Sequence, residues 1–203
     1  MKFRQISVLF LALFSFVGAY ANGAANAILK EVLANIDAQN PYRVKIEVSY
    51  ANSSMIGFYE VDHDAYYISI DQQELYGDTN VKYEVFNSRK EVIIDTVRPD
   101  NNGNLLNNPA TAFSSIRDHY SAEIITENSY FTTLELKPNS GDDSSIETIE
   151  LSVSNATKLP IEILYKFGGE QVVIKVVEIT QLSSSITLYD SDKYADYEII
   201  DFR

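Results

Sequence analysis

The stretch NNPATAFSSIRDHY, residues 107–120, differs in pattern from the sequence on either side of it. Before and after it lie short runs in which Val, Ile, Tyr and Phe alternate with polar residues, as they do in β-strands. Within it, Asn108 suits the N-cap of a helix and Pro109 its first position. Phe113 and Ile116 then follow three residues apart, on one side of a helix. The stretch therefore predicts one short amphipathic helix in the middle of a β-rich chain.

A second helix is expected near the N-terminus, over residues 24–36. Lys30 and Glu31 face away from its apolar stripe, and Asn40-Pro41 ends the helical pattern. The stripe consists of Ile28, Leu29, Val32, Leu33 and Ile36. Because both helices must bury an apolar side, we expect them to form a lid on a sheet.

The rest of the chain predicts strands of about six residues joined by short polar turns, which indicates an antiparallel meander. Gly168-Gly169 is the strongest of the hairpin signals. The expected strands cover residues 42–51, 55–61, 65–70, 73–76, 81–87, 91–97, 121–126, 129–137, 146–153, 160–167 and 171–182. The fold class is thus mainly β (α+β), with one domain over residues 22–203.

A meander of about ten or eleven strands is expected to curl into a barrel or a half-closed barrel, whose concave face would receive the helices. A curled sheet of this kind can enclose space for a ligand. The alternative is that its apolar faces fill a compact core. The faces in question are Tyr66/Ile68/Ile70, Val81/Tyr83/Val85 and Ile161/Ile163/Tyr165/Phe167.

The N-terminus has the pattern of a secretory signal peptide. The chain opens Met-Lys-Phe-Arg, continues with an almost wholly apolar run over residues 6–17, and places small residues at Ala19 and Ala21. The run is about a dozen residues long, whereas a membrane-spanning helix needs roughly 20. We expect residues 1–21 to be removed near Ala21 and the mature protein to be exported to the periplasm.

Composition narrows the classes of function. The 203 residues include no cysteine, which excludes disulfides, thiol nucleophiles, Cys-ligated metals and the acylation site of a bacterial lipoprotein. The formal net charge is −13, and loss of Lys2 and Arg4 with the signal peptide would make the mature chain more acidic. Such a surface repels nucleic acid and anionic lipid headgroups, so nucleic acid is not expected among the partners.

Catalytic motifs are not found. His63 lies in the turn Asp62-His63-Asp64, where consecutive residues cannot all converge on one ion, so a solvated turn is expected. His119 closes the central helix, where the helix dipole favours an imidazole, so we expect it to cap the helix and not to act in catalysis. Phosphate-binding glycine loops and G-x-S-x-G elbows do not occur. We therefore expect neither an enzyme nor a bound metal or cofactor.

The order of these features resembles the LolA/LolB-like family of periplasmic lipoprotein carriers, in particular its Bacteroidetes-type members. The resemblance covers nearly all of residues 22–203. It rests on Val32-Leu33-x-x-Ile36 in the first helix, on Asn108-Pro109 before the second, and on Leu159-Pro160 before a strand. The most specific element is the closing Glu198-Ile199-Ile200-Asp201-Phe202-Arg203.

The resemblance implies an unclosed antiparallel β-barrel of about eleven strands with an α-helical lid, whose hydrophobic cavity shelters the acyl chains of a lipoprotein. The partners would be an acylated lipoprotein or another lipid-like ligand, an inner-membrane exporter and an outer-membrane acceptor, and the carrier would be monomeric. The candidate ligand-binding residues of the lid are Leu29, Val32, Leu33, Ile36, Phe113 and Ile116. Those of the strands are Val44, Ile46, Val48, Tyr66, Ile68, Tyr83, Ile163 and Tyr165.

One departure concerns the arginine that latches the lid in proteobacterial members, which belongs to an Arg-Pro pair. Residues 61–66 contain no such pair, and Arg43 and Arg117 are the candidate substitutes. Three functions stay open on the sequence. They are a soluble periplasmic carrier, a non-transporting lipid- or protein-binding or sensory module on the same fold, and a filled half-barrel with a structural or interaction role.

Overall fold

The computed structural model describes residues 23–97, 103–141 and 144–203. The predicted signal peptide, residues 1–21, lies outside the described residues. None of the helices within these three ranges combines the length and the apolar character that crossing a bilayer requires.

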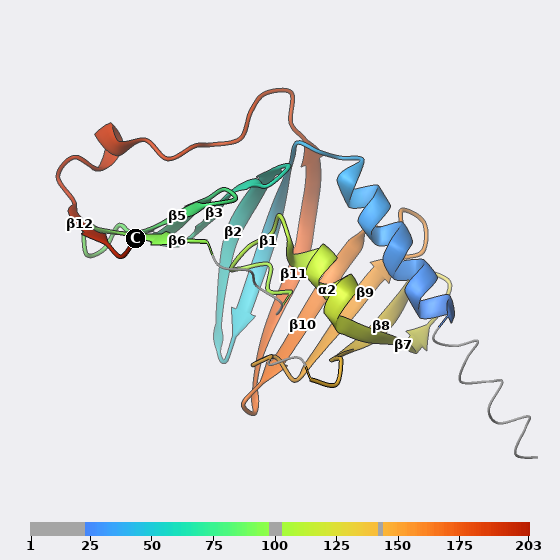
Figure 1. The fold of residues 1–203 in the computed structure, drawn as a ribbon. Coiled ribbons are helices and arrows are strands. Elements are labelled where there is room, and N and C mark those ends of the chain that lie inside the picture. The colour runs from blue at the N-terminus through green and yellow to red at the C-terminus, as the bar shows by residue number, and fades with distance from the viewer. Residues whose placement is uncertain (1–22, 98–102, 142–143) are drawn as a thin grey trace, which may run out of the picture.

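A single twelve-stranded sheet forms most of the molecule, and it is curved and unclosed (Figure 1). Its order is β12-β6-β5-β4-β3-β2-β1-β11-β10-β9-β8-β7, so β12 and β7 are its two edges. The strands are β1 Tyr42–Tyr50, β2 Ser53–Asp62, β3 Ala65–Ile70, β4 Gln73–Gly77, β5 Val81–Phe86, β6 Glu91–Thr96, β7 Tyr120–Glu127, β8 Phe131–Pro138, β9 Thr148–Ser154, β10 Pro160–Phe167, β11 Glu170–Gln181 and β12 Glu198–Asp201. The mainly β, unclosed and largely antiparallel fold class predicted from the sequence is confirmed.

The sheet consists of two antiparallel meanders, β1–β6 and β7–β11, joined in its middle where β1 pairs with β11. The predicted Gly168-Gly169 turn connects β10 to β11, and both glycines have positive φ (57° and 79°), as the primed hairpin turns require. The strand beyond the eleven expected is β12, which pairs in parallel with β6.

The chain between β6 and β7 must cross the sheet, because the two strands lie at opposite ends of it. The crossing includes α2, Ala112–His119. Both α2 and the first helix (residues 23–37, blue in Figure 1) lie on the same side of the sheet. We call this side the inner face and the opposite side the outer face. Both predicted helices are therefore present on one face, as the apolar stripes require.

The central helix begins later than predicted. Its N-cap is Thr111, three residues after Asn108. The Asn108 side chain instead accepts hydrogen bonds from the backbone N–H groups of Ala110 (3.1 Å) and Thr111 (3.3 Å). Asn108 and Pro109 thus build a separate turn that leads into the helix, because the asparagine side chain satisfies donors that would otherwise belong to the first helical turn.

Two hydrophobic clusters lie on the two faces. The inner cluster unites both helices with β1–β3 and β7–β11, and includes fully buried residues such as Ile46, Ile116 and Ile163. The outer cluster is smaller. It includes Tyr194, which is fully buried and does not belong to a strand of the sheet. Tyr194 belongs to the C-terminal segment (residues 182–203), which returns along the outer face to reach β12 (Figure 1).

A half-buried carboxylate on β4 binds this C-terminal segment. Glu74 on β4 accepts a hydrogen bond from Lys193 at 2.8 Å and from the Tyr194 hydroxyl at 2.7 Å. Burial alone would raise the pKa of Glu74, but the hydrogen bonds outweigh burial and lower this pKa to about 2. The side chains that donate these bonds are Lys193, Tyr76, Tyr194 and Asn87.

Candidate functional site

The inner face brings together all but one of the residues predicted to line a cavity. They belong to a single hydrophobic cluster that includes both helices. Its members from the prediction are Leu29, Val32, Leu33, Ile36, Val44, Ile46, Val48, Tyr66, Ile68, Phe113, Ile116, Ile163 and Tyr165. The amphipathic periodicity of helices and strands therefore located the inner face correctly.

Tyr83 lies elsewhere. It pairs with Tyr76 across β4 and β5, and both rings belong to the outer cluster. Tyr83 stacks there on Tyr189 of the C-terminal segment, with ring centroids 3.9 Å apart. The alternation of residues along β5 divides them between two faces of the sheet but does not tell which face is the inner one. The aromatic residues of the C-terminal segment were the signal in the sequence that could have identified the outer face.

A pocket of about 480 Å³ opens between the two helices at the ends of β1 and β2. We call it the interhelical pocket. Its apolar lining residues are Leu33, Ile36, Tyr42, Val61, Pro109, Ala110 and Phe113. Its polar lining residues are Asp37, Asn40, His63, Asp64, Ser114 and Arg117. Pockets for small ligands typically measure about 300–1,000 Å³ and have this combination of apolar walls and a few polar groups.

Tyr42 forms part of the pocket wall, and its ring packs edge-on against Tyr59 with centroids 6.4 Å apart. Only 4% of Tyr42 is exposed. Burial, and secondarily the charge of Asp37, raises the pKa of Tyr42, so its hydroxyl keeps its proton. Among the described residues none makes a recorded hydrogen bond with this hydroxyl. The Tyr42 side chain as a whole is buried, but its hydroxyl belongs to the pocket lining and is available to a group that enters the pocket.

The first helix is held over the inner face almost entirely by apolar packing. Within the described part of the chain, the recorded hydrogen bond between the first helix and the sheet side is Asn35 Nδ2 to the carbonyl oxygen of Thr157, at 3.3 Å and exposed. Leu29 and Val32 are buried in the inner cluster. Apolar packing lacks the directionality of hydrogen bonds, so this helix can move away from the sheet with few specific bonds to break.

A second, smaller pocket of about 200 Å³ lies on the same face next to the crossing segment. Leu106, Ile146 and Phe167 are among its lining residues. The two pockets share no lining residue, and the inner cluster on this face includes side chains such as Ile116 and Ile163, neither of which is exposed. A long apolar chain could therefore join the two spaces only if the helices shifted.

The two histidines considered in the sequence lie at the rim of the interhelical pocket or outside its lining. His63 is exposed in the β2–β3 turn at φ 57°, and its ring contacts Asp62 at 2.7 Å, in line with the solvated turn that was expected. His119 is the last residue of α2. No group of three or more His, Cys, Asp or Glu side chains within the described ranges could hold a metal ion.

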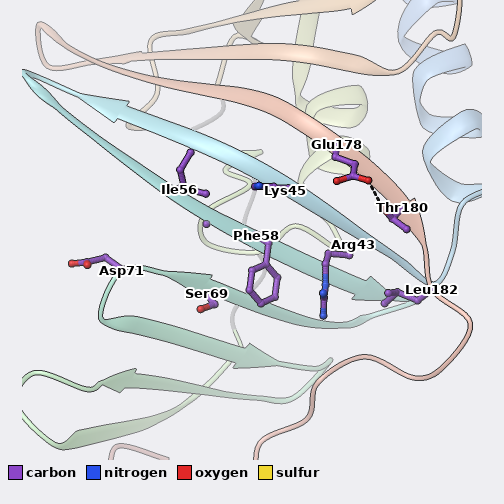
Figure 2. A pocket seen from close by; sticks show the side chains of 10 residues that line it. Arg43, Lys45, Ile56, Phe58, Ser69, Asp71, Glu178, Thr180 and Leu182 are labelled. Atoms are coloured by element: carbon purple, nitrogen blue, oxygen red, sulfur yellow. Dashed lines mark hydrogen bonds between the residues drawn. The ribbon is translucent and has the colours of Figure 1, made fainter.

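The two arginines proposed as latches occupy different faces. Arg117 lines the interhelical pocket and pairs with Asp118 through Nε at 2.6 Å. Arg43 lies on the outer face, where it bonds to buried Glu60 and stacks over Phe58 at 4.7 Å. It lines a shallow outer groove of about 500 Å³ (Figure 2). Only Arg117 is therefore placed beside the helices.

Comparison with known proteins shows similarity in structure alone. No family model matches the sequence, and no curated protein sequence matches it. The structure is similar to that of an uncharacterized conserved protein from Thermus thermophilus, with 11% identity and a TM-score of 0.56. The match covers 88% of this chain and 99% of the other, so the two proteins share one fold over almost their whole length.

Two further solved structures are similar at lower TM-scores. A LolA superfamily protein from Nitrosomonas europaea is 10% identical, with a TM-score of 0.43, and the match covers 79% of this chain and 94% of that one. The Mycobacterium tuberculosis lipoprotein LppX is 7% identical, with a TM-score of 0.48 and coverages of 80% and 98%. The chain thus has distant structural similarity to LolA superfamily proteins and LppX.

Proposed function

We propose that this protein is a periplasmic carrier that shelters the acyl chains of a lipoprotein, or of a similar amphiphile, beneath its two helices. The observation that carries the proposal is the interhelical pocket, which lies against a large apolar cluster covered by two helices, the first of which few polar bonds restrain. The same combination of curved sheet and lid is what the resemblance to LolA/LolB-like carriers implied.

The energetics of such a ligand favour this arrangement. Each methylene of an acyl chain costs about 0.8 kcal/mol to expose to water. A chain that crosses an aqueous compartment therefore requires an apolar container that can open at each membrane. In the proposed cycle the mature chain, residues 22–203, acts as a monomer, receives its cargo from an inner-membrane exporter and passes it to an outer-membrane acceptor.

A second function is favoured by one specific observation. The inner cluster is well packed, with Ile46, Leu134 and Ile149 fully buried. A non-transporting module that binds a lipid or a protein through the pocket alone would need no further opening. The two functions differ in whether long acyl chains are taken up and released.

Binding can be tested with the purified mature chain. An environment-sensitive apolar dye should bind it and be displaced by a triacylated lipopeptide at micromolar concentration. Leu33→Asp and Phe113→Asp place a charge in the pocket and should abolish both effects. Leu188→Asp is the matched control, since Leu188 is 66% exposed on the C-terminal segment.

A further variant fills the pocket without burying a charge. Ala110→Trp adds a large ring to a lining residue and should weaken dye binding, with the melting temperature of each variant as the check on folding. A folded protein that binds no dye would overturn the proposal. Release of a lipoprotein from spheroplasts by the purified protein would separate transport from binding alone.

A further inference from the structure

The mouth of the interhelical pocket carries more negative than positive charge. Asp37 and Asp64 line it from the first helix and from the β2–β3 turn. Among the described residues that line the pocket, Arg117 supplies the one guanidinium or ammonium group. Asp118 already binds this guanidinium in a fork, with Nε at 2.6 Å and the second nitrogen at 2.8 Å. The Asp118 carboxylate therefore largely neutralises this cation, whereas neither Asp37 nor Asp64 is in an ion pair recorded with another described residue.

The first helix adds to this negative potential, because it ends at residue 37 beside the pocket. A helix dipole places about half a negative charge at the C-terminal end. The backbone carbonyls of Ala34 and Ile36 are used by the N–H groups of Ala38 and Gln39, so the chain turns tightly there. The end of the helix and the Asp37 carboxylate thus act on the same side of the opening.

Tyr42 is a separate indication that a ligand with a polar end enters here. Its side chain is buried in the pocket wall, and its hydroxyl has no recorded partner among the described residues. Burial raises the pKa of Tyr42, and the negative charge of Asp37 raises it further. The pKa of Arg117 is raised mainly by its bond to Asp118 and also by the charge of Asp37. The Asp37 carboxylate therefore acts on both the pocket wall and the rim. An ammonium group can donate hydrogen bonds to a carboxylate and to a phenol oxygen at once.

We propose that the mouth of the interhelical pocket selects amphiphiles whose polar end is positively charged, such as a primary amine, over those with an anionic end. The inference rests on the proposed function, since it assumes that an apolar chain occupies the pocket. In this arrangement Asp37 and Asp64 hold the cationic group at the mouth and Tyr42 accepts a hydrogen bond from it. A carboxylate or phosphate in the same place would meet two like charges.

The probes are dodecylamine and dodecanoate, which have chains of the same length and opposite charge, used as competitors of the apolar dye below their micelle concentrations. Each exposed charge pair contributes up to about a fivefold change in affinity, so the amine should compete about tenfold better than the carboxylate at low salt. The preference should shrink as salt screens the charges.

Variants distinguish the mouth from the acidity of the whole protein. The double variant Asp37→Asn/Asp64→Asn should lose most of the preference for the amine, measured as the ratio of the affinities of the two competitors. The control is Glu31→Gln/Glu127→Gln, which removes the same amount of charge from the exposed side of the first helix and from β7. This variant should keep the preference for the amine. Tyr42→Phe, which keeps the ring, should weaken binding of the amine by about two- to fivefold relative to binding of dodecanoate.

The outcomes separate the two proposals. If neither amphiphile nor the dye binds the folded protein, the proposed function fails and the inference with it. If both amphiphiles compete equally, or dodecanoate competes better, the proposed carrier function stands. The proposed selectivity for a cationic end is then overturned. Equal loss of preference in the two double variants would assign it to general surface charge and overturn the inference as well.

Discussion

The hydroxyl of Tyr165 on β10 donates a hydrogen bond of 2.9 Å to the carbonyl oxygen of Gly103, in the segment that crosses the inner face. The same hydroxyl accepts a hydrogen bond from the backbone N–H of Leu105 at 3.2 Å. One side chain therefore fixes the crossing segment to the middle of the sheet. Since this segment leads into α2, the contact also determines where one half of the lid lies.

Tyr165→Phe should lower the free energy of unfolding by about 1–3 kcal/mol, because it leaves the buried Leu105 N–H and the Gly103 carbonyl without this partner. Urea titration measures the change, and hydrogen exchange of the Leu105 amide should accelerate. Tyr83→Phe is the matched control, since the Tyr83 hydroxyl has no recorded hydrogen bond to another described residue. Equal effects of the two variants would show that the Tyr165 contacts do not anchor the crossing.

The backbone at Gly103 should not tolerate a side chain. Its φ is +64°, and a Cβ atom would lie 2.4 Å from Cγ1 of Ile116 in α2. Gly103→Ala should therefore lower the free energy of unfolding by about 1–2 kcal/mol, because alanine is strained in the left-handed conformation. The added methyl group should also displace α2. Gly168→Ala isolates the strain, because Gly168 has a φ of +57° with open space around it.

Calorimetry of the two glycine variants gives the comparison. We expect the melting temperature to fall clearly further for Gly103→Ala than for Gly168→Ala. Equal falls would mean that α2 yields freely to the added methyl group, and that its position is not fixed by Gly103.

Sequence patterns predicted the sheet, both helices and nearly all of the inner face, because helical and strand periodicities report directly which residues are buried. They could not order the strands, since the pairing of β1 with β11 joins residues more than a hundred positions apart. Tyr83 was placed on the wrong side relative to the other candidates, because both faces of β5 are half-buried. The turn at Asn108 resembled a helix cap because the same side chain can serve either structure.

Stability at acidic pH should depend on Glu74. Because the pKa of Glu74 in the fold is about 2, below its ordinary value of 4.5, its carboxylate stabilises the fold fully above pH 4.5. This contribution is lost as the pH falls from 4.5 towards 2. After allowance for solvent screening we expect it to be about 1–2 kcal/mol. Glu74→Gln should lower stability at pH 7 and flatten the decline in this range, as measured by urea unfolding at a series of pH values.

The same variant should loosen the C-terminal segment. Lys193 and Tyr194 both bond to Glu74, so Glu74→Gln should speed proteolytic cleavage within residues 182–197 at pH 7. Glu170→Gln is a control on an exposed carboxylate that accepts a tyrosine hydrogen bond outside this segment. Cleavage at the wild-type rate in Glu74→Gln would contradict the anchoring role.

The second anchor of the segment is Glu60, which is 1% exposed and accepts hydrogen bonds from Arg43 and from the backbone N–H of Thr187 at 2.7 Å. Arg43→Ala removes the charge that compensates this buried carboxylate. Breaking a buried ion pair costs up to about 3–5 kcal/mol, and because Arg43 is half exposed we expect a loss of about 1–2 kcal/mol.

Lys45→Ala is the matched control, because Lys45 lies two residues along the same strand, faces the same outer groove (Figure 2), and has no ion pair recorded with another described residue. Arg43→Ala should reduce the free energy of unfolding and expose the segment near Thr187 to protease, whereas Lys45→Ala should do neither. If Arg43→Ala left both quantities unchanged, Thr187 alone would suffice to hold Glu60. Loss of stability in Arg43→Ala but not in Arg43→Met, which keeps an apolar stem, would instead assign the role of Arg43 to its packing on Phe58.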